Sequence, residues 1–542
     1  MTVEAAVGPV PAEEELLRVA LELGATEVGG PLTAAELQVA RNALRSGRPV
    51  PHTVDMLRAA IRCGGDPLGE ALCQLRSPLQ RRSVGAFYSP PAVVEPMVEW
   101  ALRSGPKRLV DPGCGSGRFA AAAARRDPTL EIVAVDLDPV ATILTRATLA
   151  ALGSRHALVL QHDYTTLRLE PIAERTAFVG NPPYVRHHQL SPGRKAWATR
   201  AGLSLGCHVS GLAGLHVHFY LATAMHARPD DVGCLVTSSE WLDVGYGAAI
   251  RDLLVNGLGG QSLQVVNSRA LTFDDAQTTA VVACFVVGSH PDAIRIRLVN
   301  SPAELSELDV GEPVPKEVFA RAERWTALLK PATTEVVRQV GSVRLGSIAR
   351  VHRGLVTGSN GFFVMTRVRA RELGLEEWCR PAITEAREIL EARGNVAYTP
   401  ERKLLLDVPA DVDRSLFPAL DAYLRQGEAL RINSPAVAQG YICRHRRPWW
   451  YLGKQTPPPI VASYMARQAP AFALNPDGLA LINIGHGIYP RQEMGWAELQ
   501  DLVCQLNSAR DGFRGMGRTY QGGLEKFEPR EMEALPVKQS HG

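Results

Sequence analysis

The sequence predicts an α/β protein: a mostly parallel sheet with alternating helices, preceded by a helical segment and followed by an α+β region. Apolar residues recur at helical spacing near the amino terminus, short β-rich runs alternate with helical stretches from about residue 81, and the last third mixes short strands with arginine and aromatic clusters. We expect a helical region at 1–80, a sheet domain at 81–290, a linker at 291–335 and a further domain at 336–542.

The composition bounds the class of protein. The 542 residues suffice for roughly two to four domains, with 46% apolar and 21% charged residues. Because the net charge is only +3, any nucleic-acid surface must be a local patch. The nine cysteines form no C-x-x-C pair, which favours reduced thiols in the cytoplasm over a disulfide framework or a zinc ribbon. We find neither a signal peptide nor an apolar run long enough to span a membrane.

The first 80 residues read as three amphipathic helices with no catalytic constellation. They are expected at Ala12 to Leu23, Thr33 to Arg45 and His52 to Cys63, and a shorter turn continues through Leu75. Thr33, with Glu36 three residues on, is typical of a capping box. We expect a helical cap packed on the sheet domain that comes next in the chain, with an interaction module as the alternative.

Seven runs are strand candidates in the next domain. They are Leu109 to Asp111, Ile132 to Asp136, Ala157 to Leu160, Ala177 to Gly180, Gly233 to Thr237, Leu263 to Val266 and Thr279 to Val287. Helical stretches separate the first six, as in a parallel sheet. Too few residues precede the last run for a crossover helix, so it should return antiparallel.

A glycine loop follows the first strand candidate, within Leu109 to Phe119. Its candidate ligand contacts are Asp111, Gly113, Cys114, Gly115 and Gly117. Glycines let a backbone approach a ligand closely, and the following helix offers unpaired N–H groups. A dinucleotide fingerprint needs a third glycine where Arg118 stands, so the loop disfavours NAD.

Acidic residues follow the next two strand candidates. Asp136, with Leu137 beside it, stands where a carboxylate binds ribose hydroxyls in nucleotide folds. Asp163 offers an acceptor to an adenine amino group, and Tyr164 offers a ring to lie beside it. Each acid alone is more simply a helix cap or a loop residue. Their recurrence at strand ends indicates a ligand site, because doubly wound sheets bind ligands there.

The stretch Asn181-Pro182-Pro183-Tyr184 is the candidate catalytic loop. An amino nitrogen on an aromatic ring is a poor nucleophile because its lone pair is delocalised. The Asn181 side-chain oxygen and the Pro182 carbonyl can each accept one of its protons, while Tyr184 stacks on the base, a contact worth about 1–3 kcal/mol. The alternative is an ordinary turn after a strand.

These motifs resemble the class I S-adenosylmethionine-dependent methyltransferases, and within them the γ-type DNA adenine-N6 methyltransferases of the TaqI-like and Eco57I-like kind. The match begins upstream at Gly85 to Pro91, where Tyr88, Ser89 and Pro90 resemble the motif that contacts the methionine part of the cofactor. It ends at Phe273 with Gln277 to Val282, similar to the motif whose aromatic lies on the far side of the flipped base.

The resemblance implies a Rossmann-like seven-stranded methyltransferase domain and a carboxy-terminal target-recognition domain. It implies S-adenosyl-L-methionine as cofactor, double-stranded DNA as partner, no metal, and an adenine extruded from the duplex between Tyr184 and Phe273. A separate restriction endonuclease is a further partner to expect.

Basic residues near aromatics are the candidate DNA contacts. Arg444, Arg446, Arg447 and Trp449 lie in one cluster, and Arg353 and Arg186 are further candidates. The alternative for the cluster is a core strand with buried tryptophans. The histidines at 187, 188, 208, 216 and 218 fit no standard zinc spacing.

Two rival functions stay open. An N5-glutamine protein methyltransferase or a ribosomal RNA N2-guanine methyltransferase meets the same delocalised-nitrogen problem with the same tetrapeptide. A nucleic-acid-binding subunit with an inactive methyltransferase fold is the other rival, which intact Asp111, Asp136, Asn181 and Tyr184 disfavour.

Overall fold

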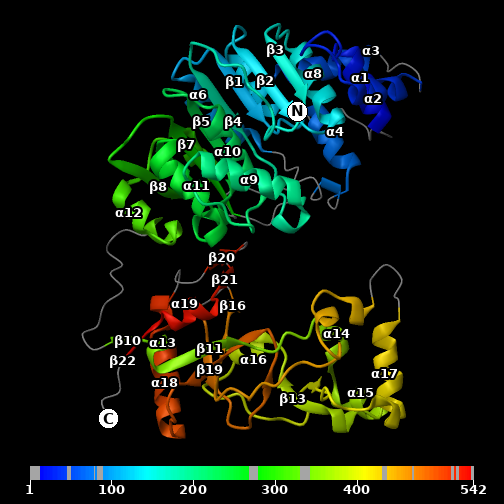
Figure 1. Ribbon diagram of the computed structural model, residues 1–542, viewed down its shortest axis with the longest axis vertical. Helices are drawn as coiled ribbons and strands as arrows, with labels where there is room; N and C mark the ends of the chain where they lie inside the picture. Colours follow the sequence, from blue (N-terminus) through cyan, green and yellow to red (C-terminus); the bar gives the residue numbers. More distant parts are fainter. Residues whose placement is uncertain are drawn as a thin grey trace. The chain divides into compact units, whose positions relative to one another are not determined.

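A computed structural model of the protein describes residues 13–45, 51–77, 80–81, 89–267, 279–329, 342–429, 436–466, 469–513, 518–520 and 524–538. The chain divides into two compact units, Met1–Pro331 and Ala332–Gly542 (Figure 1). Each unit has its own hydrophobic cores.

A mixed sheet runs through the first unit. Among the described residues it has nine strands in the order β3-β2-β1-β4-β5-β7-β6-β8-β9. The strands are β1 (Arg108–Pro112), β2 (Glu131–Asp136), β3 (Ala157–Gln161), β4 (Thr176–Gly180), β5 (Val232–Ser238), β6 (Gly260–Val266), β7 (Ala280–Val286), β8 (Ala293–Val299) and β9 (Glu312–Pro315). As the sequence predicted, β1 to β5 pair in parallel and β7 runs antiparallel to both β5 and β6.

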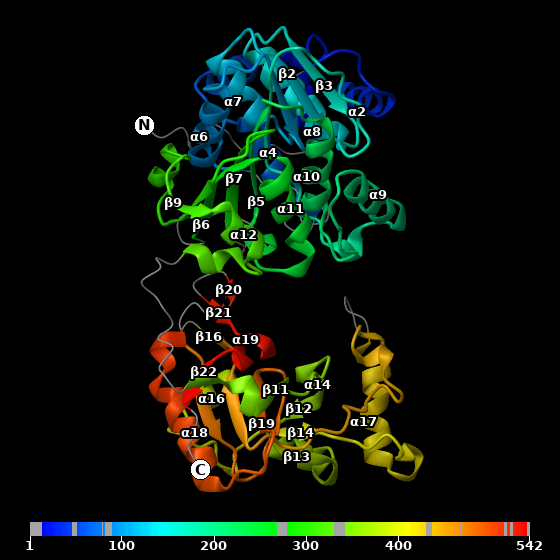
Figure 2. The same cartoon turned by 60° about the vertical axis from the view of Figure 1, so that its left-hand side comes forward.

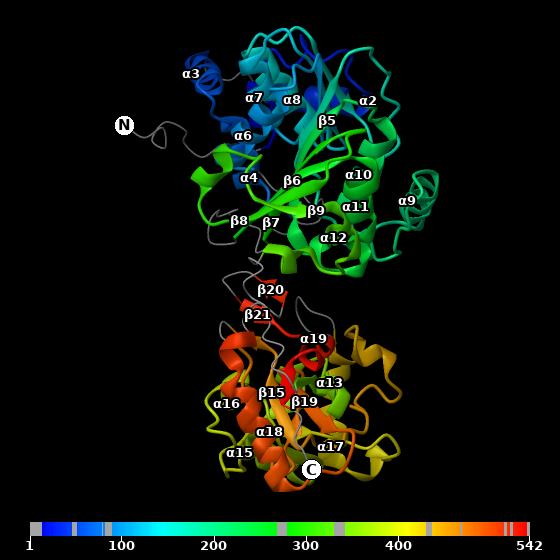
Figure 3. The ribbon, with the colours of Figure 1, turned by 90° about the vertical axis from the view of Figure 1, so that its left-hand side faces the viewer.

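Helices cover both faces of this sheet (Figure 3). They are α6 (Pro91–Leu102), α7 (Arg118–Arg126), α8 (Pro139–Ala151), α9 (Pro192–Ser204), α10 (Leu215–His226), α11 (Ala248–Asp252) and α12 (Lys316–Arg321). Alternate residues of β1 serve opposite faces: Leu109 packs in the core with α6 and α7, whereas Val110 packs with Phe219 of α10. This burial on both sides explains the apolar strands.

The amino-terminal helices form the cap that the sequence predicted. They are α1 (Glu13–Glu22), α2 (Ala34–Leu44), α3 (Pro51–Arg62) and α4 (Pro67–Leu75), and all four share a core with α8. Thr33 and Glu36 make the expected capping box. Glu36 also pairs with Arg146 of α8 at 3.0 Å, with both side chains fully buried.

The predicted linker at 291–335 is wrong as far as residue 329. β8 pairs in parallel with β6, β9 extends the sheet, and Trp325 is buried in the core below it. Two of the prolines that suggested a linker, Pro313 and Pro315, belong to the edge strand β9, where a missing N–H is tolerated. The charged residues are spread over β8, β9, α12 and the loops between them. The sheet therefore has two strands more than the seven that the resemblance implied.

The second unit is α+β, as predicted. Its strands are β10 (Ser342–Arg344), β11 (Ala349–Arg353), β12 (Val364–Met365), β13 (Cys379–Ile383), β14 (Leu404–Leu406), β15 (Ile460–Ser463), β16 (Met465–Ala466), β17 (Phe472–Leu474), β18 (Ala480–Leu481), β19 (Gly485–Pro490), β20 (Arg518–Tyr520), β21 (Leu524–Lys526) and β22 (Pro536–Lys538). Its helices are α13 (Leu345–Ile348), α14 (Asn360–Phe363), α15 (Arg367–Glu372), α16 (Ala386–Leu390), α17 (Pro418–Glu428), α18 (Trp496–Ser508) and α19 (Pro529–Glu533). α17 and α18 lie at opposite ends of the unit (Figure 2).

Candidate active site

The glycine loop and the candidate catalytic loop meet at the carboxyl ends of β1 and β4. Gly113 has a φ of +75°, and a Cβ atom added to it would lie 3.3 Å from Pro183 Cδ. Gly180, just before the tetrapeptide, faces Pro112 in the same way, with an added Cβ 3.0 Å from its Cδ. Larger side chains at either position would separate the two loops, so both glycines have a steric reason to be there.

Asp111 lies between these loops with its carboxylate fully buried. Its Oδ2 atom accepts a hydrogen bond from the Ala120 N–H at 3.2 Å, while Oδ1 has no hydrogen-bond partner among the described residues. Burial raises the pKa of Asp111 to about 8. A buried carboxylate with a free acceptor atom fits a cationic ligand, so the residues here suit the ammonium and sulfonium groups of S-adenosylmethionine.

Asp136, at the end of β2, holds the glycine loop in place. Its Oδ2 atom accepts from the Gly115 N–H and its Oδ1 atom from the Asp138 N–H, both at 2.9 Å. Each oxygen keeps a second lone pair that can accept a further hydrogen bond. Ribose binding by Asp136 stays a prediction. Leu137 is exposed beside it. The Cys114 thiol is buried 3.5 Å from Thr145 Oγ1 of α8, so this residue serves the loop through its backbone.

The structure corrects the prediction for Tyr164. Its ring is 2% exposed, contacts Phe219 and His226, and shares a hydrogen bond with Thr223 Oγ1 at 3.0 Å. A ring so enclosed cannot lie beside a cofactor adenine. Asp163 accepts from the Thr165 N–H and hydroxyl and pairs with Arg194 at 2.6 Å. Its role as an adenine acceptor stays a prediction.

The Asn181 side chain is oriented by a residue far away in the sequence. Its Nδ2 atom donates to the Ser89 hydroxyl at 3.0 Å, and Ser89 is 3% exposed. This bond makes the other end of the amide, Oδ1, the acceptor end. Pro182 is buried, and Pro183 and Tyr184 are half-buried with the Tyr184 hydroxyl shielded. Tyr88 and Phe273 lie outside the described residues, and Pro90 caps α6.

Asp66 and Arg118, for which the sequence predicted no role, lie together beside the glycine loop. Asp66 Oδ2 accepts hydrogen bonds from the Ser116 hydroxyl and from Arg118 Nε at 2.6 and 2.5 Å. The signal available in the sequence was an Asp-Pro pair at the start of a short helix, which predicts a cap and no more. The amino-terminal helices thus reach the glycine loop directly.

Comparisons with known proteins agree with this geometry. The family model described as methyltransferase small domain matches residues 98–196, and that of the type II methyltransferase M.Eco57I, C-terminal domain, matches 322–541. The type II methyltransferase M.XamI of Xanthomonas campestris pv. amaranthicola is 38% identical over 537 residues, covering 97% of this chain and 98% of that protein. The chain belongs to the type II methyltransferase family. It is an S-adenosylmethionine-dependent DNA methyltransferase of the restriction-modification kind, as predicted.

A second relative and a solved structure of similar fold also match most of the chain. M.AccI of Acinetobacter calcoaceticus is 23% identical, covering 83% of this chain and 85% of that protein. The solved structure of the type IIL restriction-modification enzyme MmeI in complex with DNA has a TM-score of 0.58 at 12% identity, covering 98% of this chain and 87% of that chain. At that identity the likeness shows the fold, which confirms the predicted class.

The glutamine methyltransferase alternative matches only a part of the chain. The release factor glutamine methyltransferase of Escherichia coli (strain K12) is 32% identical over 126 residues, 22% of this chain and 44% of that protein. M.XamI instead matches along nearly the whole of both chains. The family assignment therefore rests on the full-length match.

Two histidines of the methyltransferase are buried in α10. The His216 ring makes an edge-to-face contact with Tyr246, and the His218 ring stacks on Trp197. Burial lowers the pKa of each to about 4, so both are neutral near pH 7. Within the described ranges no three metal-ligating side chains come together, and no helix is long and apolar enough to cross a membrane.

The predicted DNA contacts fall into two groups: side chains that pack or bond within the protein, and arginines that are exposed. Trp449 is half-buried, packs on Phe362 at the edge of a core and donates from Nε1 to Glu428 Oε1 at 3.0 Å. The cluster lies in turns and a short 3₁₀ helix, so it is not the core strand of the alternative. Arg446 donates to the carbonyls of Val356 and Thr357 and so ties two loops together. Arg444 and Arg447 are exposed, as are Arg186 and Arg353, the last of which pairs with Glu528.

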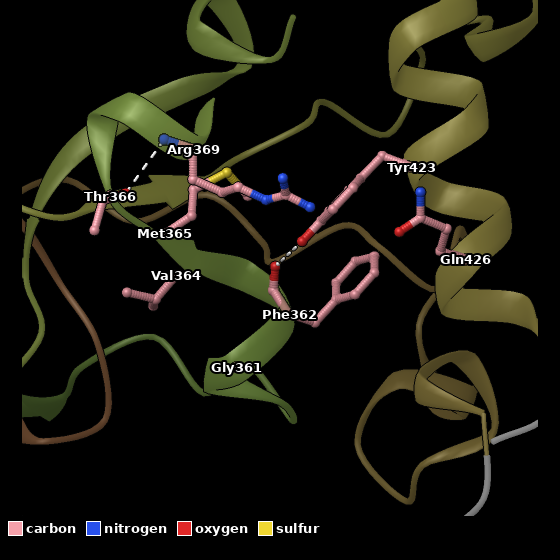
Figure 4. Close-up of a pocket in the computed structure, with 8 residues that line it drawn as sticks. All are labelled: Gly361, Phe362, Val364, Met365, Thr366, Arg369, Tyr423 and Gln426. Carbon is pink, nitrogen blue, oxygen red and sulfur yellow. Dashed lines mark hydrogen bonds between the residues drawn. The ribbon is translucent and has the colours of Figure 1, made fainter. Parts of the chain in front are cut away.

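A pocket in this second unit has no catalytic constellation (Figure 4). It is lined by Gly361, Phe362, Val364, Met365, Thr366, Arg369, Tyr423 and Gln426. Arg369 extends across it toward α17, and the Tyr423 hydroxyl donates to the Phe362 carbonyl at 2.8 Å. With a single charged side chain and no acid, the pocket offers no acid–base pair. The candidate catalytic loop lies in the first unit, after β4.

Proposed function

We propose that this methyltransferase modifies the N6 amino group of an adenine that has been flipped out of duplex DNA. The observation that carries the proposal is the bond from Asn181 Nδ2 to Ser89 Oγ, beside a glycine loop that adjoins Pro183. It presents an amide oxygen at the edge of the predicted cofactor site. An exocyclic amine on an aromatic base is the substrate that needs such an acceptor.

The residues of the tetrapeptide divide the work. Asn181 Oδ1 and the Pro182 carbonyl each accept one N–H of the amine, so its lone pair leaves the ring and points at the incoming carbon. Tyr184 stacks on the base, and Phe273 closes the opposite face. Flipping costs a few kcal/mol, roughly what one or two stacked rings return. Placing the nitrogen in line with the methyl carbon then provides most of the rate enhancement.

The cofactor contacts come from four segments. Tyr88, Ser89 and Pro90 stand on the methionine side, Asp111 faces the cationic groups, the loop from Gly113 to Gly117 approaches closely, and Asp136 with Leu137 takes the ribose. When bound, S-adenosylmethionine supplies a methyl group on a sulfonium, a good leaving group. Asp163 completes the site as the adenine acceptor. The enclosed ring of Tyr164 has no part in it.

The carboxy-terminal unit reads the DNA sequence. Its support is the match of residues 322–541 to the C-terminal domain of a type II methyltransferase, together with exposed arginines on a chain of low net charge. Arg444, Arg447 and Arg353 contact phosphates, and Arg186 does so beside the catalytic loop. A separate restriction endonuclease would share the recognition sequence.

The experiment that tests the function is long-read sequencing of DNA from cells that express the chain. We expect N6-methyladenine in one sequence context, absent when Asn181→Ala is expressed. In vitro, tritiated cofactor with duplex DNA should label DNA, and release-factor protein or ribosomal RNA should stay unlabelled. Label on cytosine N4 would keep the enzyme class and correct the base, whereas full turnover by Asn181→Ala would refute the assigned chemistry.

A further inference from the structure

A polar chain links the amino-terminal helices to the catalytic asparagine. Asp66 Oδ1 caps α4 by accepting from the Gly69 N–H at 2.9 Å, and Oδ2 faces the glycine loop. There Oδ2 accepts from Arg118 Nε at 2.5 Å and from the Ser116 hydroxyl at 2.6 Å. Both members of the ion pair are largely buried, with side chains 12% and 18% exposed. The two oxygens of one carboxylate thus serve two different segments.

Arg118 carries the connection onward. Its NH1 atom donates to the Ser89 carbonyl at 2.7 Å, and the Ser89 hydroxyl accepts from Asn181 Nδ2 at 3.0 Å. The guanidinium is planar and presents its donors in a fixed fork, so an acid on one side and a carbonyl on the other fix its orientation. The backbone of Ser89 is consequently fixed from one side while its hydroxyl orients the amide on the other.

The close approach of the segments is built into the chain. A Cβ added to Gly69 would lie 2.1 Å from Asp66 Oδ2 and 2.4 Å from Ser116 Oγ, so a larger residue there would push α4 away from the loop. Arg118 also opens α7, where the helix dipole disfavours a cation. A carboxylate beside the guanidinium offsets this unfavourable position. A cap alone would need neither the buried pair nor the glycine.

We propose that Asp66 is a positioning residue for methyl transfer: through Arg118 and Ser89 it holds the Asn181 amide in its reactive orientation. The proposal rests on the proposed role of Asn181. It makes the amino-terminal helices part of the catalytic unit. Within the described segments, this chain of hydrogen bonds connects α4 to Ser89 and Asn181, so losing the acid should change the rate of transfer more than the affinity for ligands.

The test compares substitutions at the end of α3 and at the cap of α4. Asp66→Asn keeps the Oδ1 cap on α4 and replaces the Oδ2 atom, so Arg118 loses its charged partner and the Ser116 hydroxyl loses its acceptor. The matched control is Arg62→Met, which removes the 2.9 Å bond from Arg62 Nε to the Ala151 carbonyl and so loosens the segment elsewhere. The measurements are the single-turnover rate with saturating DNA and cofactor, cofactor affinity by calorimetry, and Tm, all on the full chain.

We expect Asp66→Asn to slow transfer about 10- to 100-fold, the effect of a misplacement near 1 Å, with cofactor affinity changed only a few-fold. Arg62→Met should lower Tm and leave the rate within about twofold. Equal rates in the two variants would overturn the proposal. Arg118→Lys keeps the charge but loses the fork, so it should slow transfer as well, and it serves if Asp66→Asn does not fold.

A double-variant cycle separates positioning from general loosening. If Asp66 acts through Arg118, adding Asp66→Asn to Arg118→Lys should slow transfer by less than about twofold, because coupled residues are not additive. If the fold-reductions in rate of the two single variants multiply in the double variant, Asp66 does not act through Arg118. This outcome can be distinguished from a failure of the proposed function. An active Asn181→Ala variant would refute the proposed function. An inactive Asn181→Ala variant together with a normal rate for Asp66→Asn would refute only the positioning role of Asp66.

Discussion

Asn181 and Ser89 lie 92 residues apart in the chain, yet the Asn181 amide nitrogen donates to the Ser89 hydroxyl at 3.0 Å. Because an amide can rotate to exchange its oxygen and nitrogen, this single bond decides which atom faces the substrate. We expect Ser89→Ala to slow methyl transfer about tenfold, the equivalent of about 1.4 kcal/mol. Ser89→Thr keeps the hydroxyl and should retain activity. Rapid-quench turnover measures both, and equal rates for Ala and Thr would contradict the role.

The raised pKa of Asp111 predicts a pH-dependent affinity for the cofactor. Burial raises this pKa to about 8 from an ordinary value near 3.8, so the free protein holds a proton at neutral pH that the unfolded chain does not. Stability without cofactor therefore falls as pH rises through this window. A cationic ligand prefers the ionised carboxylate, so affinity should rise between pH 6 and 8, by at most about tenfold per unit.

Calorimetry in two buffers of different ionisation enthalpy measures the proton released on binding at pH 7. The Asp111→Asn variant should bind the cofactor weakly and release no proton from residue 111. An affinity that stays flat from pH 6 to 8 in the wild-type protein would show that Asp111 is already ionised before the cofactor arrives.

Gly113 and Gly105 offer a matched pair of glycines with positive φ. Their φ values are +75° and +65°, but an added Cβ meets Pro183 at Gly113 and nothing within 4 Å at Gly105. Either substitution by alanine should destabilise by about 1–2 kcal/mol through backbone strain. Only Gly113→Ala should also abolish cofactor binding and activity. If Gly105→Ala impairs turnover equally, the effect is strain and not contact with the catalytic loop.

The buried Arg146–Glu36 pair should anchor the amino-terminal cap. Arg146 also donates to the carbonyls of Val28, Gly30, Pro31 and Val159, all of which lose a partner in Arg146→Met. We expect Arg146→Met to lower the free energy of unfolding of the first unit by about 3–5 kcal/mol. Arg103→Met breaks pairs with Glu99 and Asp309 that are about half exposed, and should shift stability by under about 1 kcal/mol. Similar losses for the two would argue against the anchor.

Arg444 and Trp449 should separate DNA affinity from stability. Arg444 is exposed, so Arg444→Ala should weaken DNA binding and reduce the salt slope by about one, with Tm unchanged. Trp449→Ala opens a gap beside Phe362 and should cost about 2–4 kcal/mol, below the value for a fully buried tryptophan. Fluorescence anisotropy against salt and thermal unfolding measure the two effects. A stable Trp449→Ala that cannot bind DNA would restore its predicted contact.

Local patterns in the sequence sufficed for much of the fold. Alternation of β-rich and helical runs placed the first seven strands, and the short loop before Thr279 predicted the antiparallel β7. The Thr33 cap and the glycine loop followed from residue types at fixed spacing. These features depend on neighbours a few residues away, and such preferences are visible in one stretch of chain.

Contacts between distant segments were decided only by tertiary structure. Tyr164 turned inward because Phe219 and Thr223 of α10 enclose it, and residues 293–315 joined the sheet because the β6 edge was open to pair with β8. The link from Asp66 to Arg118 spans 52 residues and carries no local signature beyond a helix cap. Which side chain faces a site is set by what packs behind it. The chain alone predicted the first seven strands and the two loops, whereas folding determined which groups meet.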